Sequence, residues 1–296
     1  MDRRRFLALL GVAGTGGAAA TLASRGPGGD ASAAPAEATE EVLVEQPQLP
    51  ERGTHRVIWA VETDEPMASL TFDDGPDPEF TPRILEVLDR YGVRATFFMM
   101  GWNARKHASL AREVVAAGHE IGNHTWSHHN LLYTTPEDTV EQMTRGAAAL
   151  EDVTGQRPAW FRPPRGQLSG ITIRQAAILG TDTVIWSLER GAPSSAPAAE
   201  VRRYLGEHLG IGDIVDLHDG LGRGTFNPGR PFTEDLRHRR EVEIEALPGV
   251  IEDALGRGLR FGTVSDLVAV ERVAARTTGT PPADPDEVVD LTSEMS

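Results

Sequence analysis

The sequence predicts an α/β protein whose core is a parallel sheet, either open or closed into a barrel. Short apolar runs alternate strictly with amphipathic stretches between residues 67 and 263, as in chains of strand–helix units. Turn-forming residues such as Gly75-Pro76 and Gly118 separate these segments. Polar residues capable of chemistry directly follow several apolar runs, and α/β proteins hold their active sites at the carboxyl ends of parallel strands.

Each predicted strand is a short apolar run that suits a buried position. The seven predicted strands cover 67–72, 95–100, a few residues around Ile121, 160–162, 183–186, 213–217 and 260–263. The predicted helices begin at Thr81 and then cover 104–117, 136–153, 171–179, 198–209 and 241–255. Pro82 suits the first turn of its helix and Gly118 ends the next helix, whereas the last helix is expected to continue despite Pro248.

The segments outside this core are interpreted as a targeting signal, a linker and a tail. Residues 1–33 begin with an arginine cluster, continue with a weakly apolar stretch interrupted by glycines, and end in small residues. This pattern resembles a twin-arginine export signal, and an uncleaved N-terminal anchor is the alternative. Residues 34–55 form an acidic Pro/Ala/Glu linker, 56–270 the folded domain and 271–296 a disordered acidic tail.

The signal has consequences for location and partners. We expect the twin-arginine export machinery as a partner and a secreted or cell-envelope location. The apolar stretch is too weak for a stable membrane-spanning helix, so no transmembrane domain is expected after processing.

The composition excludes several classes of protein. The chain has 296 residues and no cysteine, which excludes disulfide scaffolds, thiolate zinc sites, iron–sulfur clusters and cysteine nucleophiles. Its formal net charge of −15 argues against nucleic acid as the main partner, because a phosphate backbone requires a basic surface. Any metal site in this chain must therefore use histidines and carboxylates.

Two histidines have the spacing of metal ligands. His124 and His128 lie four residues apart, which would place both rings on one face of a helical turn. A zincin would need glutamate directly after the first histidine, and Thr125 excludes that class of metalloprotease. Two histidines need a third ligand, and Asp73-Asp74 after the first long strand is the natural source of a carboxylate. One aspartate would then bind the metal, and the other would act as a general base. Surface or capping histidines and turn-forming aspartates are the alternative interpretation.

With these residues the chain resembles the polysaccharide deacetylases that carry the NodB homology domain (carbohydrate esterase family 4). The resemblance runs from about Met67 to Leu267. Its matching motifs are Thr71-Phe72-Asp73-Asp74-Gly75-Pro76, His124-Thr-Trp-Ser-His128, Phe161-Arg162-Pro163-Pro164-Arg165-Gly166 and Leu217-His218-Asp219.

The resemblance implies a fold, an activity and a set of residue roles. The implied fold is a distorted (β/α) barrel of about seven parallel strands. The implied activity is metal-dependent removal of N-acetyl or O-acetyl groups from sugars of an extracellular polysaccharide such as peptidoglycan or a chitin-like glycan. The implied cofactor is one divalent ion, with Zn²⁺ as the first candidate and Co²⁺, Ni²⁺ or Mn²⁺ as alternatives. The implied roles are catalytic base for Asp73, metal ligands for Asp74, His124 and His128, orientation of the base for Arg162, general acid for His218, and an oxyanion-binding backbone N–H near Arg165.

Three departures from the family pattern affect the acid and the acyl pocket. Arg165 replaces the usual tyrosine, and the fourth motif's Asp-Trp pair is missing near Ala192. Asp216 stands where the fifth motif has leucine. Residues two apart on a strand share a face, so we hypothesise that Asp216 has taken over from the missing aspartate in tuning His218. Glu189 is the other candidate, and a decayed site with a solvated Asp216 is the alternative.

Two rival functions use the same residues. A non-haem iron oxygenase also needs two histidines and one carboxylate, but its carboxylate usually lies one residue from a histidine. A catalytically weak glycan- or metal-binding relative is the other rival. The segment between Gly220 and Arg240 is predicted as a basic, partly aromatic loop, either contacting an anionic glycan or simply solvated.

Overall fold

The computed structural model describes residues 54–193 and 195–272. The predicted export signal, nearly all of the linker and most of the acidic tail lie outside these residues. Within the two described ranges, no helix has both the length and the apolar character needed to cross a membrane.

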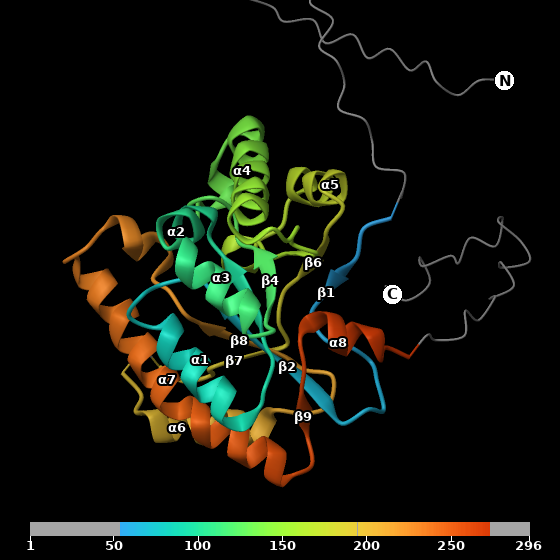
Figure 1. The fold of residues 1–296 in the computed structure, drawn as a ribbon, viewed down its shortest axis with the longest axis vertical. Coiled ribbons are helices and arrows are strands. Elements are labelled where there is room, and N and C mark those ends of the chain that lie inside the picture. Colours follow the sequence, from blue (N-terminus) through green and yellow to red (C-terminus); the bar gives the residue numbers. More distant parts are fainter. Residues whose placement is uncertain (1–53, 194, 273–296) are drawn as a thin grey trace, which may run out of the picture. The chain divides into compact units, whose positions relative to one another are not determined.

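The described residues form a curved parallel sheet, which confirms the predicted fold class (Figure 1). Its strands are paired in the order β1-β6-β5-β4-β3-β2-β8-β7, and β9 pairs with the first residues of β2. The strands are β1 (Val57–Ile58), β2 (Met67–Asp73), β3 (Thr96–Met99), β4 (Glu120–Asn123), β5 (Trp160–Phe161), β6 (Asp182–Val184), β7 (Leu188–Glu189), β8 (Ile214–His218) and β9 (Arg260–Phe261). All seven predicted strands are present, and the two-residue strands β1 and β7 were not predicted.

The barrel is distorted because one seam lacks a regular ladder. Residues 185–187 run between β6 and β7 along this seam, where Ser187 N–H donates to the carbonyl of Ile214 at 3.1 Å. Val61 N–H donates to the carbonyl of Gly212 at 2.9 Å on the same side. The two ends of the strand order, β1 and β7, are not paired with each other, and this side of the sheet is joined by single hydrogen bonds and by one isolated antiparallel bridge between Ala60 and Asp213.

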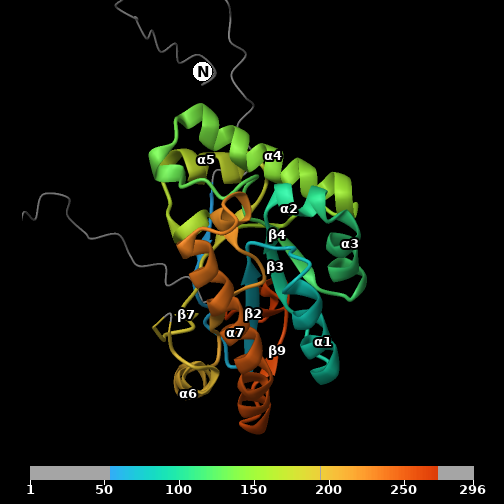
Figure 2. The ribbon, with the colours of Figure 1, turned by 90° about the vertical axis from the view of Figure 1, so that its left-hand side faces the viewer.

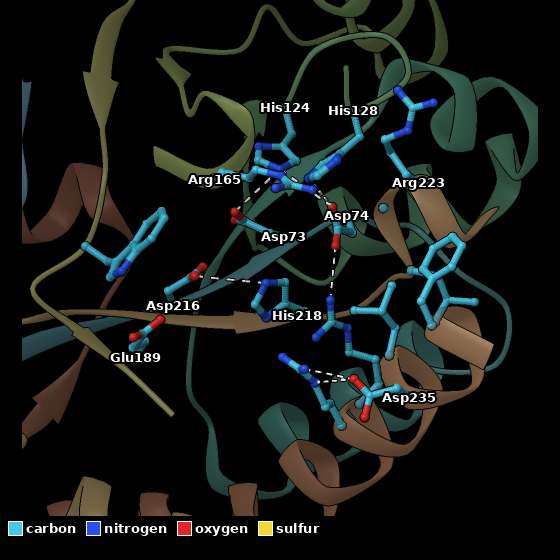
Figure 3. Close-up of a pocket in the computed structure, with 17 residues that line it drawn as sticks. Asp73, Asp74, His124, His128, Arg165, Glu189, Asp216, His218, Arg223 and Asp235 are labelled. Atoms are coloured by element: carbon cyan, nitrogen blue, oxygen red, sulfur yellow. Dashed lines mark hydrogen bonds and ion pairs between the residues drawn. The ribbon is translucent and has the colours of Figure 1, made fainter. Parts of the chain in front are cut away.

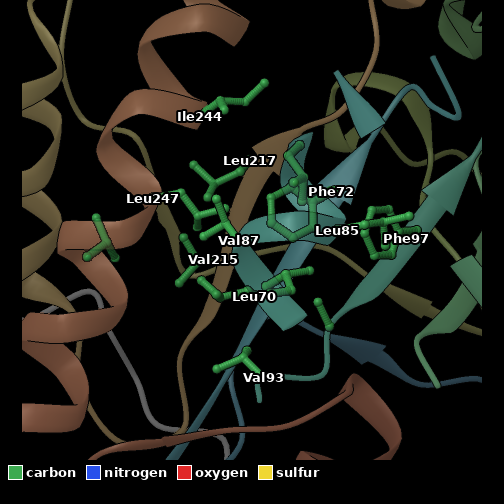
Figure 4. Close-up of a cluster of buried hydrophobic side chains, with 14 of the residues drawn as sticks. Leu70, Phe72, Leu85, Val87, Val93, Phe97, Val215, Leu217, Ile244 and Leu247 are labelled. Carbon is green, nitrogen blue, oxygen red and sulfur yellow. The ribbon is translucent and has the colours of Figure 1, made fainter. Parts of the chain in front are cut away.

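Strand β2 shows how the sequence fills both sides of the sheet. All seven of its residues are buried, and successive side chains point to opposite faces. Leu70 and Phe72 belong to the apolar core between sheet and helices, together with Leu217 of β8 (Figure 4). Thr71 and Asp73 lie on the other face, inside the barrel. The side chains of β2 therefore contribute to the apolar core on the helix-facing side of the sheet and to the polar interior of the barrel on the other side.

The helices cover the outer face of the sheet, with α1 beside α7 and α4 at the opposite end (Figures 1 and 2). They are α1 (Thr81–Tyr91), α2 (Gly101–Lys106), α3 (Ala108–Ala116), α4 (Pro136–Thr154), α5 (Gly170–Ile178), α6 (Ala198–His208), α7 (Pro231–Gly256) and α8 (Val264–Ala269). Three short 3₁₀ helices are η1 (Leu131–Tyr133), η2 (Pro164–Gly166) and η3 (Gly222–Phe226).

Two predicted elements were wrong in their boundaries. The helix predicted over 104–117 is two helices, because the non-helical backbone of His107 (φ −121°, ψ 48°) separates α2 from α3. The loop predicted between Gly220 and Arg240 is largely helical, because α7 begins at Pro231, a residue that suits a first helical turn. Arg240 therefore lies inside a helix and is buried, rather than on a solvated loop.

Candidate active site

The polar residues singled out from the sequence meet at the carboxyl ends of the strands. Asp73 ends β2, His124 follows β4, Arg162 follows β5 and His218 ends β8. A cavity of about 480 Å³ opens there, a size typical of small-ligand sites (Figure 3). Asp73, Asp74, His124, His128, Arg165, Glu189, Asp216 and His218 are among the residues that line it.

The backbone at the end of β2 separates the two adjacent aspartates. Asp73 keeps strand geometry and points into the barrel, like Thr71 two residues earlier. Asp74 has φ 80°, a left-handed conformation that is uncommon for a residue with a side chain. It therefore turns away from Asp73 and toward the two histidines (Figure 3).

The segment from His124 to His128 is a tight non-helical turn, so the condition under which the spacing would place both rings on one helical face is not met. Thr125 and His128 have φ values of 69° and 55°, outside the helical region. Local hydrogen bonds hold this turn, since Asn123 Oδ1 accepts from Thr125 N–H at 3.0 Å and Thr125 Oγ1 from His128 N–H at 3.1 Å. The two imidazole centroids still lie 5.1 Å apart.

Backbone strain is concentrated around this cavity. Among the described residues, four other than glycine have positive φ: Asp74, Thr125, His128 and Arg165. Asp74, His128 and Arg165 line the cavity, and Thr125 lies in the turn between its two histidines. Such conformations cost of order 1–3 kcal/mol each and persist where the surrounding structure holds them in place, typically at functional sites.

Asp74, His124 and His128 form a three-residue cluster that fits a metal ion. Their ligand atoms all lie within 4.8 Å of one another. Asp74 Oδ1 is buried without a hydrogen-bond partner and lies 3.6 Å from His124 Nε2 and 3.3 Å from His128 Nε2. His124 Nδ1 lies 2.8 Å from the carbonyl of Arg162, which leaves Nε2 with its lone pair facing Asp74. One orphaned oxygen and two imidazole nitrogens are a suitable donor set for a divalent ion.

The other oxygen of Asp74 is held from the opposite side. Arg240 of α7 donates from Nη2 to Asp74 Oδ2 at 3.2 Å and from Nε to the carbonyl of Gly220 at 2.7 Å. Gly222 has φ 51°, and a β-carbon there would come within 2.9 Å of Asp74 Oδ1. Glycine at that position keeps the space beside the carboxylate open.

Arg162 holds Asp73 from inside the barrel. Its guanidinium is fully buried, and Nη1 donates to Asp73 Oδ1 at 2.8 Å and to Thr71 Oγ1 at 2.7 Å. The same nitrogen donates to Asp216 Oδ1 at 3.2 Å. The remaining guanidinium nitrogens donate to backbone carbonyls at the end of β6, so the side chain has little freedom to move. Arg162 therefore joins two carboxylates that come from the neighbouring strands β2 and β8.

Burial and neighbouring charges shift the pKa values of the site. Burial and Arg240 lower the pKa of His218, but Asp216 and Glu243 outweigh them and raise it to about 9. Burial and Asp73 raise the pKa of Asp216 to about 7. Burial lowers the pKa of His128 to about 4, so this imidazole is neutral and able to bind a metal. Although burial opposes ionisation, the three histidines and Arg240 hold the pKa of Asp74 well below its usual range.

The other three predicted site residues differ in burial, because Asp216 is buried and Arg165 and Glu189 are exposed. Asp216 lies on the same strand face as His218, with 4.0 Å between Oδ2 and Nε2. Arg165 lines the cavity with an exposed side chain and a left-handed backbone (φ 64°). Glu189 lines the cavity from β7 but is exposed. The segment predicted as a basic, partly aromatic loop lines the cavity with Arg223, Phe232 and Arg239, and it contributes the buried Arg240 to the interior of the site.

Two buried residues of the site were missed in the sequence. Glu243 and Arg240 lie on α7, and both are nearly inaccessible to solvent. A signal was available, because Glu243 precedes Leu247 by four residues and Val250 by seven, the spacing of one helix face. A charged residue in register with the apolar face of a helix indicates a buried charge that needs a partner.

Comparisons with known proteins agree with this architecture. A family model described as polysaccharide deacetylase matches residues 60–184. A peptidoglycan-N-acetylglucosamine deacetylase of Bacillus cereus is 33% identical over 217 residues, covering 73% of this chain and 94% of the relative. The crystal structure of a peptidoglycan N-acetylglucosamine deacetylase bound to a hydroxamate-type benzamide superposes with a TM-score of 0.64 and 28% identity, covering 73% of this chain and 95% of the other.

A second solved structure shares the fold alone. A carbohydrate esterase family 4 pseudoenzyme from Bacillus anthracis superposes with a TM-score of 0.63 and 23% identity, covering 74% of this chain and 71% of that one. The fold therefore occurs with and without activity, and the side chains of the site must carry the functional argument.

Proposed function

The chain belongs to the polysaccharide deacetylase family, and from this premise we propose that it is a metal-dependent hydrolase that removes acetyl groups from N-acetylated sugars of an extracellular glycan. The observation that carries the proposal is the orphaned Asp74 Oδ1 between two imidazole nitrogens, with the Arg162-bound Asp73 beside it. Peptidoglycan is the first candidate substrate, because the similar proteins named above act on its N-acetylglucosamine. Chitin-like glycans and O-acetyl esters are the alternatives.

Asp74, His124 and His128 would hold one divalent ion, with Zn²⁺ as the first candidate. Such an ion supplies Lewis acidity, which acidifies water and polarises an acyl oxygen. A non-haem iron oxygenase uses a similar ligand set, but membership in a hydrolase family supports deacetylation.

Asp73 is the proposed general base. Arg162 holds its Oδ1 at 2.8 Å, while Oδ2 lies 3.6 Å from His124 Nε2 and therefore faces the metal cluster. Asp73 takes a proton from water as the water oxygen bonds to the acyl carbon. Arg162 fixes the orientation of this carboxylate, because its guanidinium is itself fixed by backbone carbonyls.

His218 is the proposed general acid, which completes the reaction. As the carbon–nitrogen bond breaks, its electron pair stays on nitrogen, which accepts a proton from His218 Nε2. Amide and water thereby become acetate and amine. The backbone N–H of Arg165 is the candidate donor to the acyl oxygen, and this role is independent of the side chain, which is arginine here.

The test is release of acetate by purified protein from a panel of N-acetylated chitooligosaccharides, peptidoglycan fragments and acetylated xylan. We expect release from at least one N-acetylated glycan, loss of release after treatment with a chelator, and recovery on adding Zn²⁺. Metal-loaded protein that binds a glycan but releases no acetate from any substrate would instead support the catalytically weak relative.

A further inference from the structure

His218 lies between two carboxylates that come from different parts of the chain. Its Nε2 lies 4.0 Å from Asp216 Oδ2, and its Nδ1 lies 3.5 Å from Glu243 Oε2. Oε2 of Glu243 also accepts the backbone N–H of His218 at 3.0 Å. One oxygen of Glu243 therefore contacts His218 at both its backbone and its ring.

Glu243 is held in place by its surroundings. It is 3% exposed, and its Oε1 lies 3.7 Å from Arg240 Nη1 and 3.9 Å from Arg190 Nε. Although burial opposes ionisation, His218 and Arg240 lower the pKa of Glu243, so it carries its negative charge at neutral pH. The two arginines lie at ion-pair distance on the Oε1 side of the carboxylate, although Oε1 accepts no hydrogen bond, and Oε2 is on the side of the histidine.

Asp216 is less suited to hold the ring. Its Oδ1 accepts from Arg162, and burial together with Asp73 raises its pKa to about 7. Its Oδ2 lies on the Nε2 side of His218, which is the side that faces the cavity (Figure 3). A carboxylate on that side would compete with substrate for the proton to be delivered.

We propose that Glu243 of helix α7 is the residue that positions His218, by accepting the Nδ1 proton and so directing Nε2–H toward the scissile group. This inference rests on the proposed function, since it assigns His218 as the proton donor to the leaving nitrogen. An imidazole with one nitrogen bound to a fixed carboxylate has a defined tautomer and ring orientation. After Nε2 has given up its proton, the neutral ring keeps Nδ1–H on Glu243.

The proposal explains why α7 carries two buried charges of opposite sign. Arg240 and Glu243 lie three residues apart on the helix, and they contact Asp74 and His218 respectively. A lone buried glutamate would be costly, whereas a paired one next to a cationic histidine is stabilised. Helix α7 thus carries the carboxylate that orients His218. The family pattern places the corresponding aspartate in the loop after β7, where it is missing near Ala192 in this chain.

The test compares two leaving groups in Glu243→Gln and in the matched control Glu245→Gln, an exposed glutamate on the same helix. An N-acetylglucosamine oligomer releases an amine that must be protonated, whereas 4-nitrophenyl acetate releases a phenolate that needs no acid. In Glu243→Gln we expect kcat for the oligomer to fall by on the order of 10²-fold, the scale of a lost general acid, with KM little changed. Hydrolysis of the aryl ester should fall by less than about 3-fold, and Glu245→Gln should match the wild type on both substrates.

Equal losses on both substrates, or no loss on the oligomer, would overturn the proposal. Metal content and thermal melting of each variant separate these outcomes from misfolding. If Glu243→Gln does not fold, Glu243→Asp keeps the charge but withdraws it by one methylene, and it should show the same selective loss on the oligomer to a smaller extent. Wild-type protein that hydrolyses neither substrate would contradict the proposed function itself.

Discussion

Arg240 and Asp74 form a buried ion pair that links helix α7 to the end of strand β2, with 3.2 Å between Nη2 and Oδ2. In this pair, Oδ2 of Asp74 is bound to Arg240. Of the two oxygens of Asp74, only Oδ1 then faces His124 and His128. A metal ion at this position would bind Asp74 through one oxygen and leave room for water and substrate.

Loss of either histidine should abolish metal binding. We expect one divalent ion per wild-type chain and a large loss of bound metal in His124→Ala and His128→Ala, because two remaining ligands hold a divalent ion weakly. Metal content after dialysis, measured by elemental analysis, checks this expectation. His129→Ala is the control, since this neighbouring histidine does not line the cavity. Unchanged metal content in both ligand variants would refute the site.

Asp73→Asn should separate catalysis from metal binding. The amide oxygen can still accept from Arg162, but it cannot take a proton from water. We expect turnover to fall by on the order of 10²-fold or more while metal content stays at the wild-type level. Both quantities can be measured on the same preparation. If the substitution removed the metal instead, the roles of Asp73 and Asp74 would have to be exchanged.

The alkaline limb of the pH–rate profile should depend on Asp216. A general acid works only when protonated, so activity is present below the pKa of His218 and is lost as the pH rises through about 9. Asp216 is one of the groups that raise this pKa. Asp216→Asn keeps an acceptor for Arg162 and should move the alkaline limb to lower pH. An unmoved limb would show that Asp216 does not tune His218.

Export should depend on the arginines near the N-terminus, which lie outside the described residues. Replacing Arg3 and Arg4 with lysine keeps the charge but removes the feature that characterises a twin-arginine signal. We expect the variant to accumulate in the cytoplasm, as measured by fractionation, while a signal for unfolded chains would tolerate the change. Undiminished secretion would favour that other route.

Local sequence was enough to locate much of the site. An apolar run that ends in acidic residues, as at Asp73, predicts a buried strand with chemistry at its carboxyl end. The alternation of runs predicts that such ends meet at one edge of a parallel sheet. For this reason Asp73, His124, Arg162 and His218 were expected in one place. In the structure Asp73, His124 and His218 line one cavity, and the buried Arg162 is hydrogen-bonded to Asp73.

The sequence by itself determined the order of strands and helices, because hydrophobic periodicity and turn residues act over a few neighbouring positions. Only the tertiary structure decided which carboxylate contacts which histidine or arginine. Glu243 falls in the helix predicted over 241–255 and Arg240 at the end of the predicted basic loop. The two residues become a buried link between Asp74 and His218 only when α7 packs against β8. The backbone at Asp74 likewise turns toward the histidines because contacts from α7 and the glycines after β8 hold it there. Burial and long-range charge depend on segments far apart in the chain. Local spacing can therefore indicate that Glu243 is buried, but it cannot identify the residues that Glu243 contacts.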